Sequence, residues 1–286
     1  MNIIVDAGGQ TCNRFFEFIY YLKKAIITGE KVKVLIPDVT IEDFPILKKN
    51  KYISFPLYNS FWTRLFGLKR NIRIIKFLKK VFINKKLHPI YKVIFFNKLK
   101  FVKGQDTWFI DEDYSDVKLI FRELFKVNNN IQRKVDTYFE NNINNKSIVI
   151  GIHIRWGDYK IWKNGKYFFT EDIYFEYMKK IQKELGEEQN ISFIISSNSK
   201  IDINKFKPLK CFQMPQSSAA EDLYALSKCD YIIGPVSTFS SWVSFLYEIP
   251  LYCITAKDDY KTMRLIDFSA TKNFLYKRNG YQFDRS

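Results

Sequence analysis

A short polar segment in the second half of the chain, HIRWGDY, begins at His153 and could act on a charged ligand. It overlaps the end of an apolar run, Ser147–Ile154, which is typical of a strand buried on both faces. Arg155 would emerge where that strand ends, and its planar, permanently charged guanidinium suits a diphosphate. His153 alternates with Arg155 along the strand, so both side chains would point the same way. The segment predicts an anion site; the structural alternative is an ion pair between Arg155 and Asp158 beside a satisfied His153.

Two neighbours of the arginine would shape such a site. Gly157 lets the backbone turn sharply directly after the strand. Asp158 could orient Arg155 or accept a proton from a reacting hydroxyl. A carboxylate next to an arginine has a lowered pKa and is a poor base, which favours the orienting role. Asp6, near the start of the chain, is a second candidate for the base.

A second candidate site is the segment PVSTFSS, residues Pro235–Ser241, where a strand runs into a helix start rich in hydroxyl groups. Backbone N–H groups and hydroxyls at a helix N-terminus can hold an anion. The candidate ligands of a phosphate are Ser237, Thr238, Ser240 and Ser241. The same pattern also fits a plain helix cap formed by Ser237 or Thr238. No G-x-x-x-x-G-K-[ST] motif occurs, which argues against an ATPase or GTPase.

Two weaker candidates lie elsewhere. Gly8 and Gly9 precede a predicted helix and would permit close backbone approach to a ligand, and Asn13 could cap that helix. Asp222 falls in the first turn of another predicted helix, where a carboxylate stabilises the N-terminus. It could also accept hydrogen bonds from a guanine edge or a ribose. Ser196, Ser197 and Asn198 add further polar groups at the end of a predicted strand.

Several kinds of site are not expected. The chain has two histidines and four cysteines, and the cysteines show no C-x-x-C spacing, so neither a zinc ribbon nor a disulfide framework is predicted. No G-x-S-x-G motif supports a serine hydrolase. No convincing D-x-D loop is present, and we expect no metal ion and no cofactor to be required.

The elements that must position these residues form two blocks of alternating strands and helices. The first has strands at 2–5 and 32–36 around a helix that Gly29 ends. The second has strands at 147–154, 191–195, 231–233 and 251–254, and helices that begin after Thr170 and Ser218 and at Ser237 or Thr238. Gly234 and Pro235 are expected to form a turn, and the Asn-rich segments 128–130 and 140–146 polar connections.

Such alternation predicts parallel sheets with helices on both faces. The fold class is α/β, with two Rossmann-like domains facing across a cleft, one at residues 1–145 and the other at 146–286. Ligands of such sheets bind beyond the carboxyl ends of the strands, where the polar segments above are found.

The positive charge is concentrated in one segment. The chain has 46 Lys and Arg against 30 Asp and Glu, a formal net charge of +16. Residues 64–103 hold thirteen Lys and Arg and no acidic residue, with apolar residues at helical spacing. This segment fits an ordinary surface helix, an anionic membrane surface or, less well, a nucleic acid, because no nucleic-acid module accompanies it. No signal peptide or spanning segment is recognised, so a cytoplasmic location, peripheral at the plasma membrane in one interpretation, is expected.

Taken together, these motifs resemble the alpha-1,2-fucosyltransferase family and its relatives that use GDP-fucose. The resemblance rests on four segments in the same order as in the family: Gly8-Gly9…Asn13-Arg14, His153–Tyr159, Asp222–Cys229 (DLYALSKC) and Ser237–Trp242 (STFSSW). It covers the second half well and leaves residues 40–140 without a match. It implies a two-domain GT-B fold, an inverting transfer without a required metal, and a C-terminal half that holds the nucleotide sugar.

The resemblance also implies roles for single residues. Arg155 would hold the diphosphate, His153 would lie beside the nucleotide, and Asp222 would contact guanine or ribose. Ser240 or Ser241 would bind phosphate. The sequence departs from the family at Trp156, which stands where the motif has a second arginine, and in the loop Cys12-Asn13-Arg14.

The function predicted in this way is transfer of L-fucose from GDP-fucose to a hydroxyl of a glycan acceptor, through an alpha-1,2 linkage, in bacterial surface polysaccharide synthesis. The acceptor is lipid-linked in one interpretation, and no nucleic acid is expected as a partner. The alternatives are another GDP-sugar as donor, a non-catalytic nucleotide-sugar-binding protein, or a basic nucleic-acid-binding protein centred on residues 64–103.

Overall fold

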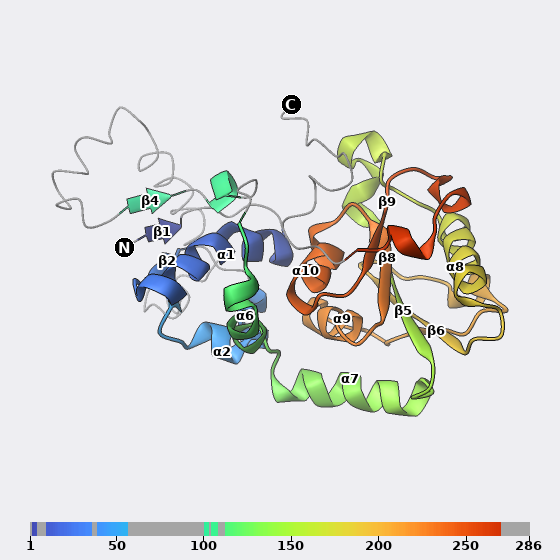
Figure 1. Ribbon diagram of the computed structural model, residues 1–286, viewed down its shortest axis with the longest axis horizontal. Coiled ribbons are helices and arrows are strands. Elements are labelled where there is room, and N and C mark those ends of the chain that lie inside the picture. The colour runs from blue at the N-terminus through green and yellow to red at the C-terminus, as the bar shows by residue number, and fades with distance from the viewer. Residues whose placement is uncertain are drawn as a thin grey trace. The chain divides into compact units, whose positions relative to one another are not determined.

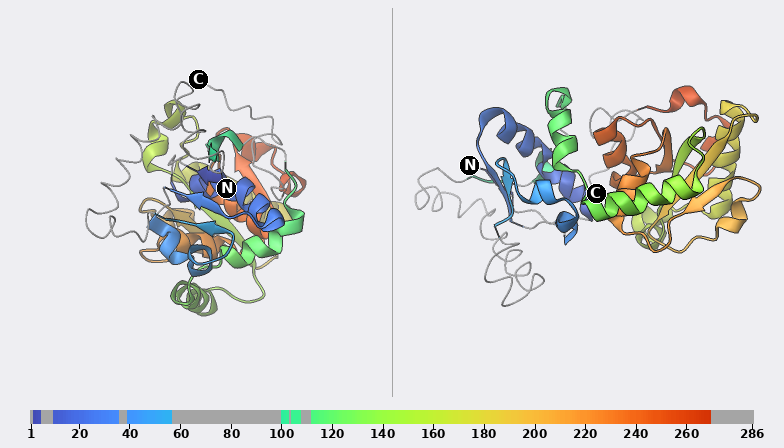
Figure 2. Two further views of the ribbon diagram at one scale, coloured as in Figure 1. Left: turned by 90° about the vertical axis from the view of Figure 1, so that its left-hand side faces the viewer. Right: turned by 90° about the horizontal axis from the view of Figure 1, so that it is seen from below.

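The computed structural model describes residues 2–4, 10–35, 39–56, 100–102, 104–107 and 112–269. The chain divides into two compact units, Met1–Lys126 and Val127–Ser286 (Figure 1). Each contains a sheet in which all neighbouring strands are parallel. The division falls before residue 127 rather than near 145, because helix α7 (Asn129–Asn142) packs along helix α9 (Ala219–Leu226) of the second unit (Figure 2). Most of the basic segment 64–103 lies outside the described residues.

The first unit has a four-stranded sheet of order β3-β2-β1-β4. Its strands are β1 (Asn2–Ile4), β2 (Val32–Val34), β3 (Ile53–Ser54) and β4 (Lys100–Val102). Its helices are α1 (Thr11–Thr28), α2 (Pro45–Lys48) and α6 (Lys118–Leu124), with short 3-10 turns η1 (Val39–Asp43), η2 (Gly104–Thr107) and η3 (Ser115–Val117). The predicted strands at 2–5 and 32–36 are confirmed in shorter form.

The two ends of helix α1 differ in how well the sequence predicts them. Gly29 ends it in the left-handed conformation (φ 75°), as predicted, and its N–H donates to the carbonyl of Ala25. The prediction that Asn13 caps the helix is wrong, because the helix begins at Thr11 and Gln10 occupies the cap position. Asn13 is therefore the third residue of the helix and lies within its first turn.

The second unit has a five-stranded sheet of order β7-β6-β5-β8-β9. Its strands are β5 (Ile148–Ile154), β6 (Ile191–Ser197), β7 (Cys211–Gln213), β8 (Tyr231–Pro235) and β9 (Leu251–Ile254). Besides α7 and α9 it contains α8 (Glu171–Leu185), α10 (Thr238–Tyr247) and the 3-10 turns η4 (Gly157–Lys160), η5 (Trp162–Gly165), η6 (Ile203–Phe206), η7 (Asp259–Lys261) and η8 (Leu265–Asp267). Helix α8 covers one face of the sheet, and α9 and α10 cover the other (Figure 1).

The predicted strands of this unit are all present, with one difference at β8. Gly234 and Pro235 continue the strand instead of forming a turn, and they pair with Cys253 and Ile254 of β9. The pairing of β8 with β5 ends at Ile233. Pro235 has no neighbour on that side, so its missing N–H removes no bond from the sheet there.

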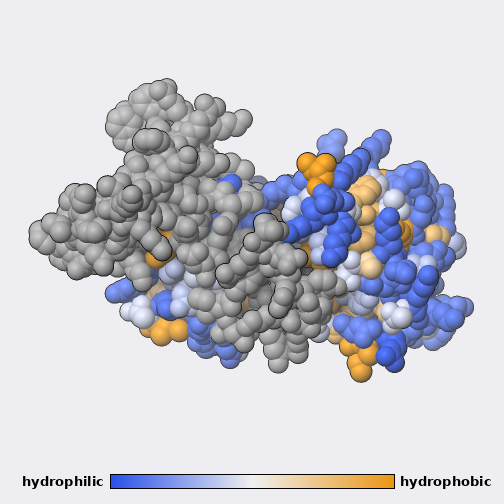
Figure 3. Space-filling model, turned by 90° about the horizontal axis from the view of Figure 1, so that it is seen from above, coloured by the Kyte–Doolittle hydropathy of each residue, from blue (hydrophilic) through white to orange (hydrophobic). Residues whose placement is uncertain are grey.

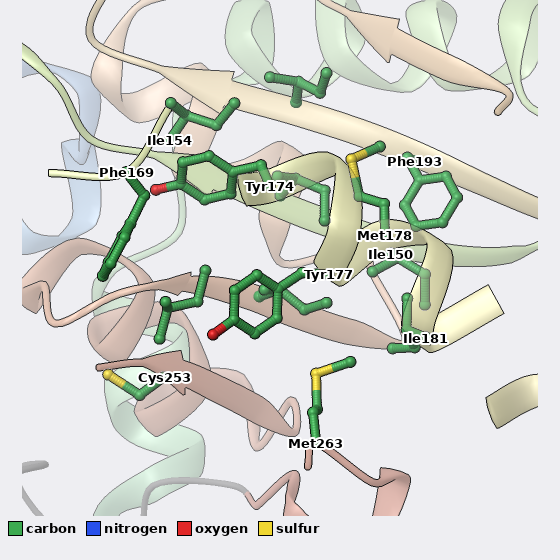
Figure 4. Packing of buried hydrophobic residues seen from close by; sticks show 14 of the residues in the cluster. Ile150, Ile154, Phe169, Tyr174, Tyr177, Met178, Ile181, Phe193, Cys253 and Met263 are labelled. Carbon is green, nitrogen blue, oxygen red and sulfur yellow. The ribbon is translucent and has the colours of Figure 1, made fainter. Parts of the chain in front are cut away.

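The face under α8 is filled by a single apolar cluster. The cluster includes three fully buried residues of the strands, Ile150 and Ile152 of β5 and Phe193 of β6. They pack against Tyr174 and Tyr177 of α8 (Figure 4). Residues at alternate positions of each strand point to the same face, so the intervening positions of β5 and β6 belong to the α9 and α10 side. That division places the polar residues of the site on one side of the sheet.

Candidate functional site

Near the carboxyl end of β5, side chains at alternate positions face α9 and α10. Gly151 already faces that side: a Cβ there would lie 2.6 Å from Leu226 Cδ2, so α9 packs directly on the strand. Two residues further along, His153 takes the same side, and Gly234 of β8 leaves room for it, since a Cβ at Gly234 would lie 3.0 Å from His153 Cβ. Arg155 follows as the strand ends.

His153 is a buried imidazole with an unused nitrogen. Its side chain packs on the ring of Phe239 at 5.0 Å between centroids, and the residue is 3% exposed. Burial, and secondly the charge of Arg155, lower the pKa of His153 to about 3, so the ring is neutral at physiological pH. Its Nδ1 atom has no hydrogen-bond partner among the described residues. The structural alternative of a satisfied histidine is therefore wrong, and Nδ1 is available to a ligand.

Ser196 and Asp222 bring two more buried polar groups to this side. Ser196 is the register partner of His153 on β6, and Asp222 comes from the first turn of α9. Burial raises the pKa of Asp222 to about 6, and the hydroxyls of Ser217 and Ser196 offset part of that rise. Ser196 Oγ is buried and adjoins the Asp222 carboxyl. The unpaired His153 nitrogen and a carboxyl with a raised pKa indicate a site shaped for a polar ligand.

Arg155 and Asp158 form the ion pair that the sequence allowed as an alternative. Arg155 Nη2 lies 2.9 Å from Asp158 Oδ1, and the guanidinium carbon lies 5.5 Å from the centre of the Tyr159 ring. The Arg155 side chain is 11% exposed and that of Asp158 53%. The guanidinium of Arg155 is thus in contact with an aromatic ring and paired with a carboxylate. This arrangement orients the guanidinium and still leaves it a planar fork of further donors.

The turn after Arg155 is fixed by a residue from the next strand. Gly157 adopts a left-handed conformation (φ 56°), and a Cβ there would lie 3.0 Å from Asn198 Nδ2. Asn198 Oδ1 accepts a hydrogen bond from the backbone N–H of Trp156 at 2.9 Å. The indole N–H of Trp156 in turn donates to the carbonyl of Phe169 at 2.7 Å. Trp156 therefore anchors the loop. It occupies the position of the second arginine in the motif but supplies no positive charge there.

The N-terminus of α10 is capped as predicted, by Ser237, whose Oγ accepts from Phe239 N at 3.2 Å. Ser240 Oγ donates to the Ser237 carbonyl at 3.5 Å, and Ser241 Oγ donates to the same carbonyl. Both serines are at most 1% exposed. Their hydroxyls are directed into the helix, so at this helix start the half-buried Thr238 and the backbone are better placed to meet an anion.

The remaining predicted residues belong to the first half of the chain. Gly8, Gly9 and Asp6 lie outside the described residues, and Asn13 is a half-buried residue of the first unit. Within the described ranges, no three His, Cys, Asp or Glu side chains gather as a metal ion would require. Ser196 and Asn198 were noted only as polar strand-end residues; the register of two parallel strands, which places Ser196 opposite His153, was the missing signal.

Comparison with known proteins fits this arrangement. Residues 45–272 match the sequence model of the family described as Glycosyl transferase family 11. The chain belongs to glycosyl transferase family 11. It is therefore a glycosyltransferase, and the resemblance inferred from its motifs is confirmed. Among curated proteins, none matches the sequence significantly.

Solved structures of fucosyltransferases share the fold. Fucosyltransferase NodZ from Bradyrhizobium is 15% identical with a TM-score of 0.53, over 88% of this chain and 94% of that one. POFUT1 in complex with GDP-fucose is 10% identical with a TM-score of 0.54, over 89% and 97%. A mutant of Arabidopsis thaliana FUT1 in complex with GDP is 13% identical with a TM-score of 0.56, over 96% and 74%. The expected GT-B fold, with two α/β units built on parallel sheets, is confirmed.

The helices of the described residues do not have the character of membrane spans. None of those in the described part of the chain combines the length and the apolar character that a membrane crossing needs.

Proposed function

We propose that this glycosyltransferase moves L-fucose from GDP-fucose to a hydroxyl of a glycan acceptor, with inversion at the anomeric carbon. The observation that carries the proposal is the end of β5, where the oriented guanidinium of Arg155 adjoins the buried, unpaired Nδ1 of His153. Family membership supports it, as do fold relatives that are described as fucosyltransferases, among them NodZ soaked with GDP-fucose.

Arg155 is the residue to which we assign the departing diphosphate. During transfer the bond from the anomeric carbon to the β-phosphate oxygen breaks and the acceptor oxygen bonds to that carbon. Negative charge develops on the leaving oxygens, where a fixed cation stabilises the transition state most. The N-terminus of α10, with Ser237 and Thr238, would add backbone N–H groups on the same side of the sheet. Ser240 and Ser241 would help only indirectly, by shaping this helix start.

His153, Ser196 and Asp222 would receive the rest of the donor. A neutral imidazole nitrogen can accept a hydrogen bond, and a serine hydroxyl can donate or accept one. Asp222 would accept hydrogen bonds from a guanine edge or a ribose hydroxyl. Donors placed against that carboxylate would favour its ionised form and bring its pKa back down from about 6.

Asp158 is assigned the orienting role. Its carboxylate pairs with Arg155 at 2.9 Å and so holds the guanidinium in place. Gly8, Gly9 and Asn13 would serve the acceptor side, and the proton of the acceptor hydroxyl would leave to a base other than Asp158. The alpha-1,2 linkage, a role in bacterial surface polysaccharide synthesis, a lipid-linked acceptor and a cytoplasmic, membrane-peripheral location belong to the same proposal.

A donor screen tests the proposal. Hydrolysis and transfer would be measured with GDP-fucose, GDP-mannose and UDP-sugars, and GDP-fucose should be the preferred donor. Arg155→Ala should lower the rate by ~10²–10³, the usual effect of removing one donor that stabilises developing negative charge. Arg133→Ala, which removes an exposed arginine of α7, is the matched control and should leave the rate unchanged.

Binding can be measured separately from chemistry. GDP should raise the melting temperature by an amount that grows with the logarithm of its concentration relative to Kd, and ADP and UDP should raise it less. Equal activity of Arg155→Ala and the native chain, or no stabilisation by GDP, would contradict the proposal.

A further inference from the structure

The loop that follows the ion pair carries an exposed apolar tip within a basic surface. Ile161 is 83% exposed, and Lys160, Lys163 and Lys166 around it are exposed as well. From Tyr159 to Thr170 the sequence contains no Asp or Glu. Figure 3 views the molecule from above and shows small hydrophobic spots among mostly hydrophilic residues on the part of this face that is coloured.

Single exposed apolar residues are common, so the surroundings decide whether one matters. Ile266 is 84% exposed, but it is followed by Asp267, whose carboxylate binds the backbone of Arg264, and Glu184 lies near that turn. Ile161 differs because the charges beside it in the loop are all positive. Together these features describe a loop, Lys160–Lys166, with one exposed apolar side chain and three cations.

Aromatic packing holds this tip in place. Trp162 packs against Tyr159 at 4.8 Å and against Tyr167 at 5.4 Å between ring centroids. The bond from Trp156 Nε1 to the Phe169 carbonyl closes the base of the loop at 2.7 Å. Within the loop, Asn164 N donates to Ile161 O at 3.2 Å. Ile161 is thus presented by an ordered aromatic platform.

We propose that the loop Lys160–Lys166 lies on an anionic lipid bilayer, with Ile161 inserted at the level of the headgroups. Apolar side chains flanked by lysines bind such interfaces, because burial of the apolar group adds to attraction by anionic lipids. Indole and phenol rings are favoured at the same depth. A glycan would instead be met by an open aromatic face, whereas here the most exposed apolar group is aliphatic and Trp162 is packed between two tyrosines.

This contact would set the orientation of the enzyme on the membrane. The loop begins two residues after Asp158, so the Arg155–Asp158 pair would lie near the lipid surface. An acceptor anchored in the bilayer would then be presented close to the donor site. The membrane contact itself does not depend on which sugar nucleotide is used.

The test is flotation of the full chain with vesicles of phosphatidylcholine, with and without phosphatidylglycerol. The native chain should float with the anionic vesicles only. Ile161→Asp should weaken binding roughly tenfold or more, the effect of exposing one buried aliphatic side chain. Ile266→Asp, at an equally exposed isoleucine, should bind as the native chain does.

A second variant tests the charges. Changing Lys160, Lys163 and Lys166 together to Gln should weaken binding to anionic vesicles by roughly fivefold per lysine. The same change at the exposed Lys200, Lys207 and Lys210 is the matched control and should have a clearly smaller effect. Donor hydrolysis without vesicles should be unaffected in all four variants, which separates failure of this inference from failure of the proposed function.

Three outcomes would overturn the proposal. The native chain could fail to bind anionic vesicles, it could bind neutral vesicles equally well, or both loop variants could bind like the native chain. The last result would assign any membrane binding to another part of the chain. Retention on an immobilised acidic polysaccharide that the triple loop variant abolishes, without vesicle binding, would assign the loop to a glycan instead.

Discussion

The two faces of the sheet in the second unit are built from the same strands but differ in the polarity of the side chains that they bury. Under α8, β5 and β6 contribute Ile150, Ile152, Phe193 and Ile195 to a continuous apolar cluster (Figure 4). On the other face, the alternate positions of these strands hold buried polar residues as well as apolar ones such as Ile194. The polar residues on the strands are His153, Ser192 and Ser196, and those on the covering helices include Asp222, Ser240, Ser241 and Ser244.

The difference shows how one sheet can separate stability from chemistry. Apolar burial under α8 stabilises the unit at about 25 cal/mol per Å² of surface removed from water. On the opposite face, an unpaired buried polar group costs about 1–3 kcal/mol. The unpaired Nδ1 of His153 lies at the carboxyl end of β5, where ligands of such sheets bind. A ligand bound there would satisfy this nitrogen.

The largest effect is expected where the apolar face is broken. Phe193→Ala should lower the free energy of unfolding by about 3–5 kcal/mol, because it opens a cavity in the α8 cluster. Ser192→Ala, one residue earlier on the opposite face, is the control and should change it by about 1 kcal/mol at most. Urea unfolding measures both. Equal losses for the two variants would mean that the faces do not differ in their contribution to stability.

On the polar face, removing a charge should stabilise the fold. Burial raises the pKa of Asp222 from 3.8 to about 6, so the native state holds its proton more tightly than the unfolded chain does. Stability is therefore lost as pH rises from about 4 to 6, and one pKa unit corresponds to about 1.4 kcal/mol. Asp222→Asn should raise the free energy of unfolding by up to ~3 kcal/mol above pH 6, and by little near pH 4.

Thermal unfolding of both proteins across this pH range measures the difference. His153, whose pKa is lowered, acts in the opposite sense and destabilises the fold as pH falls below 6.5, but its effect cancels in the comparison. The variant should also bind GDP less well, since the asparagine carries no charge. A gain in stability that does not vary with pH would show that Asp222 is not the group responsible.

How far the sequence could predict this arrangement depends on how far apart in the chain the interacting residues lie. Strand β5 and the capping box of Ser218 and Glu221 follow from residues close together in the chain, and both are confirmed. Asn128 was expected in a polar connection but caps α7, with its Oδ1 accepting from Asn130 and Ile131. The continuation of β8 through Pro235 depends on where a neighbouring strand stops, which local sequence does not state.

The site itself was predictable to the level of its motifs. His153 faces α10 from near the end of β5, Arg155 follows directly after the strand, and Ser237 caps α10 as expected. The inward direction of the Ser240 and Ser241 hydroxyls could not be predicted, because it depends on helix geometry relative to the Ser237 carbonyl. The anchoring role of Trp156 required the position of Phe169, thirteen residues away in the chain.

The smallest expected effect concerns the turn that directly follows β5. Asn198 accepts from Trp156 N at 2.9 Å, and this contact is exposed, so water can replace it with little change in stability. Asn198→Ala should nevertheless lower kcat by roughly tenfold, since a small displacement of Arg155 weakens its alignment with the leaving group. The KM for the donor should change less, because His153 and Asp222 remain in place.

Asn198→Asp keeps the accepting Oδ1 and should restore most of the rate, which a merely structural role would not require. Steady-state kinetics with the donor proposed above, alongside melting temperatures, separates these effects. If the aspartate variant is as slow as the alanine variant, the hydrogen bond to Trp156 is not what positions the turn. In that case the Nδ2 amide of Asn198, which lies 3.0 Å from the site of a Cβ at Gly157 and which the aspartate lacks, becomes the group that links β6 to the turn after Arg155.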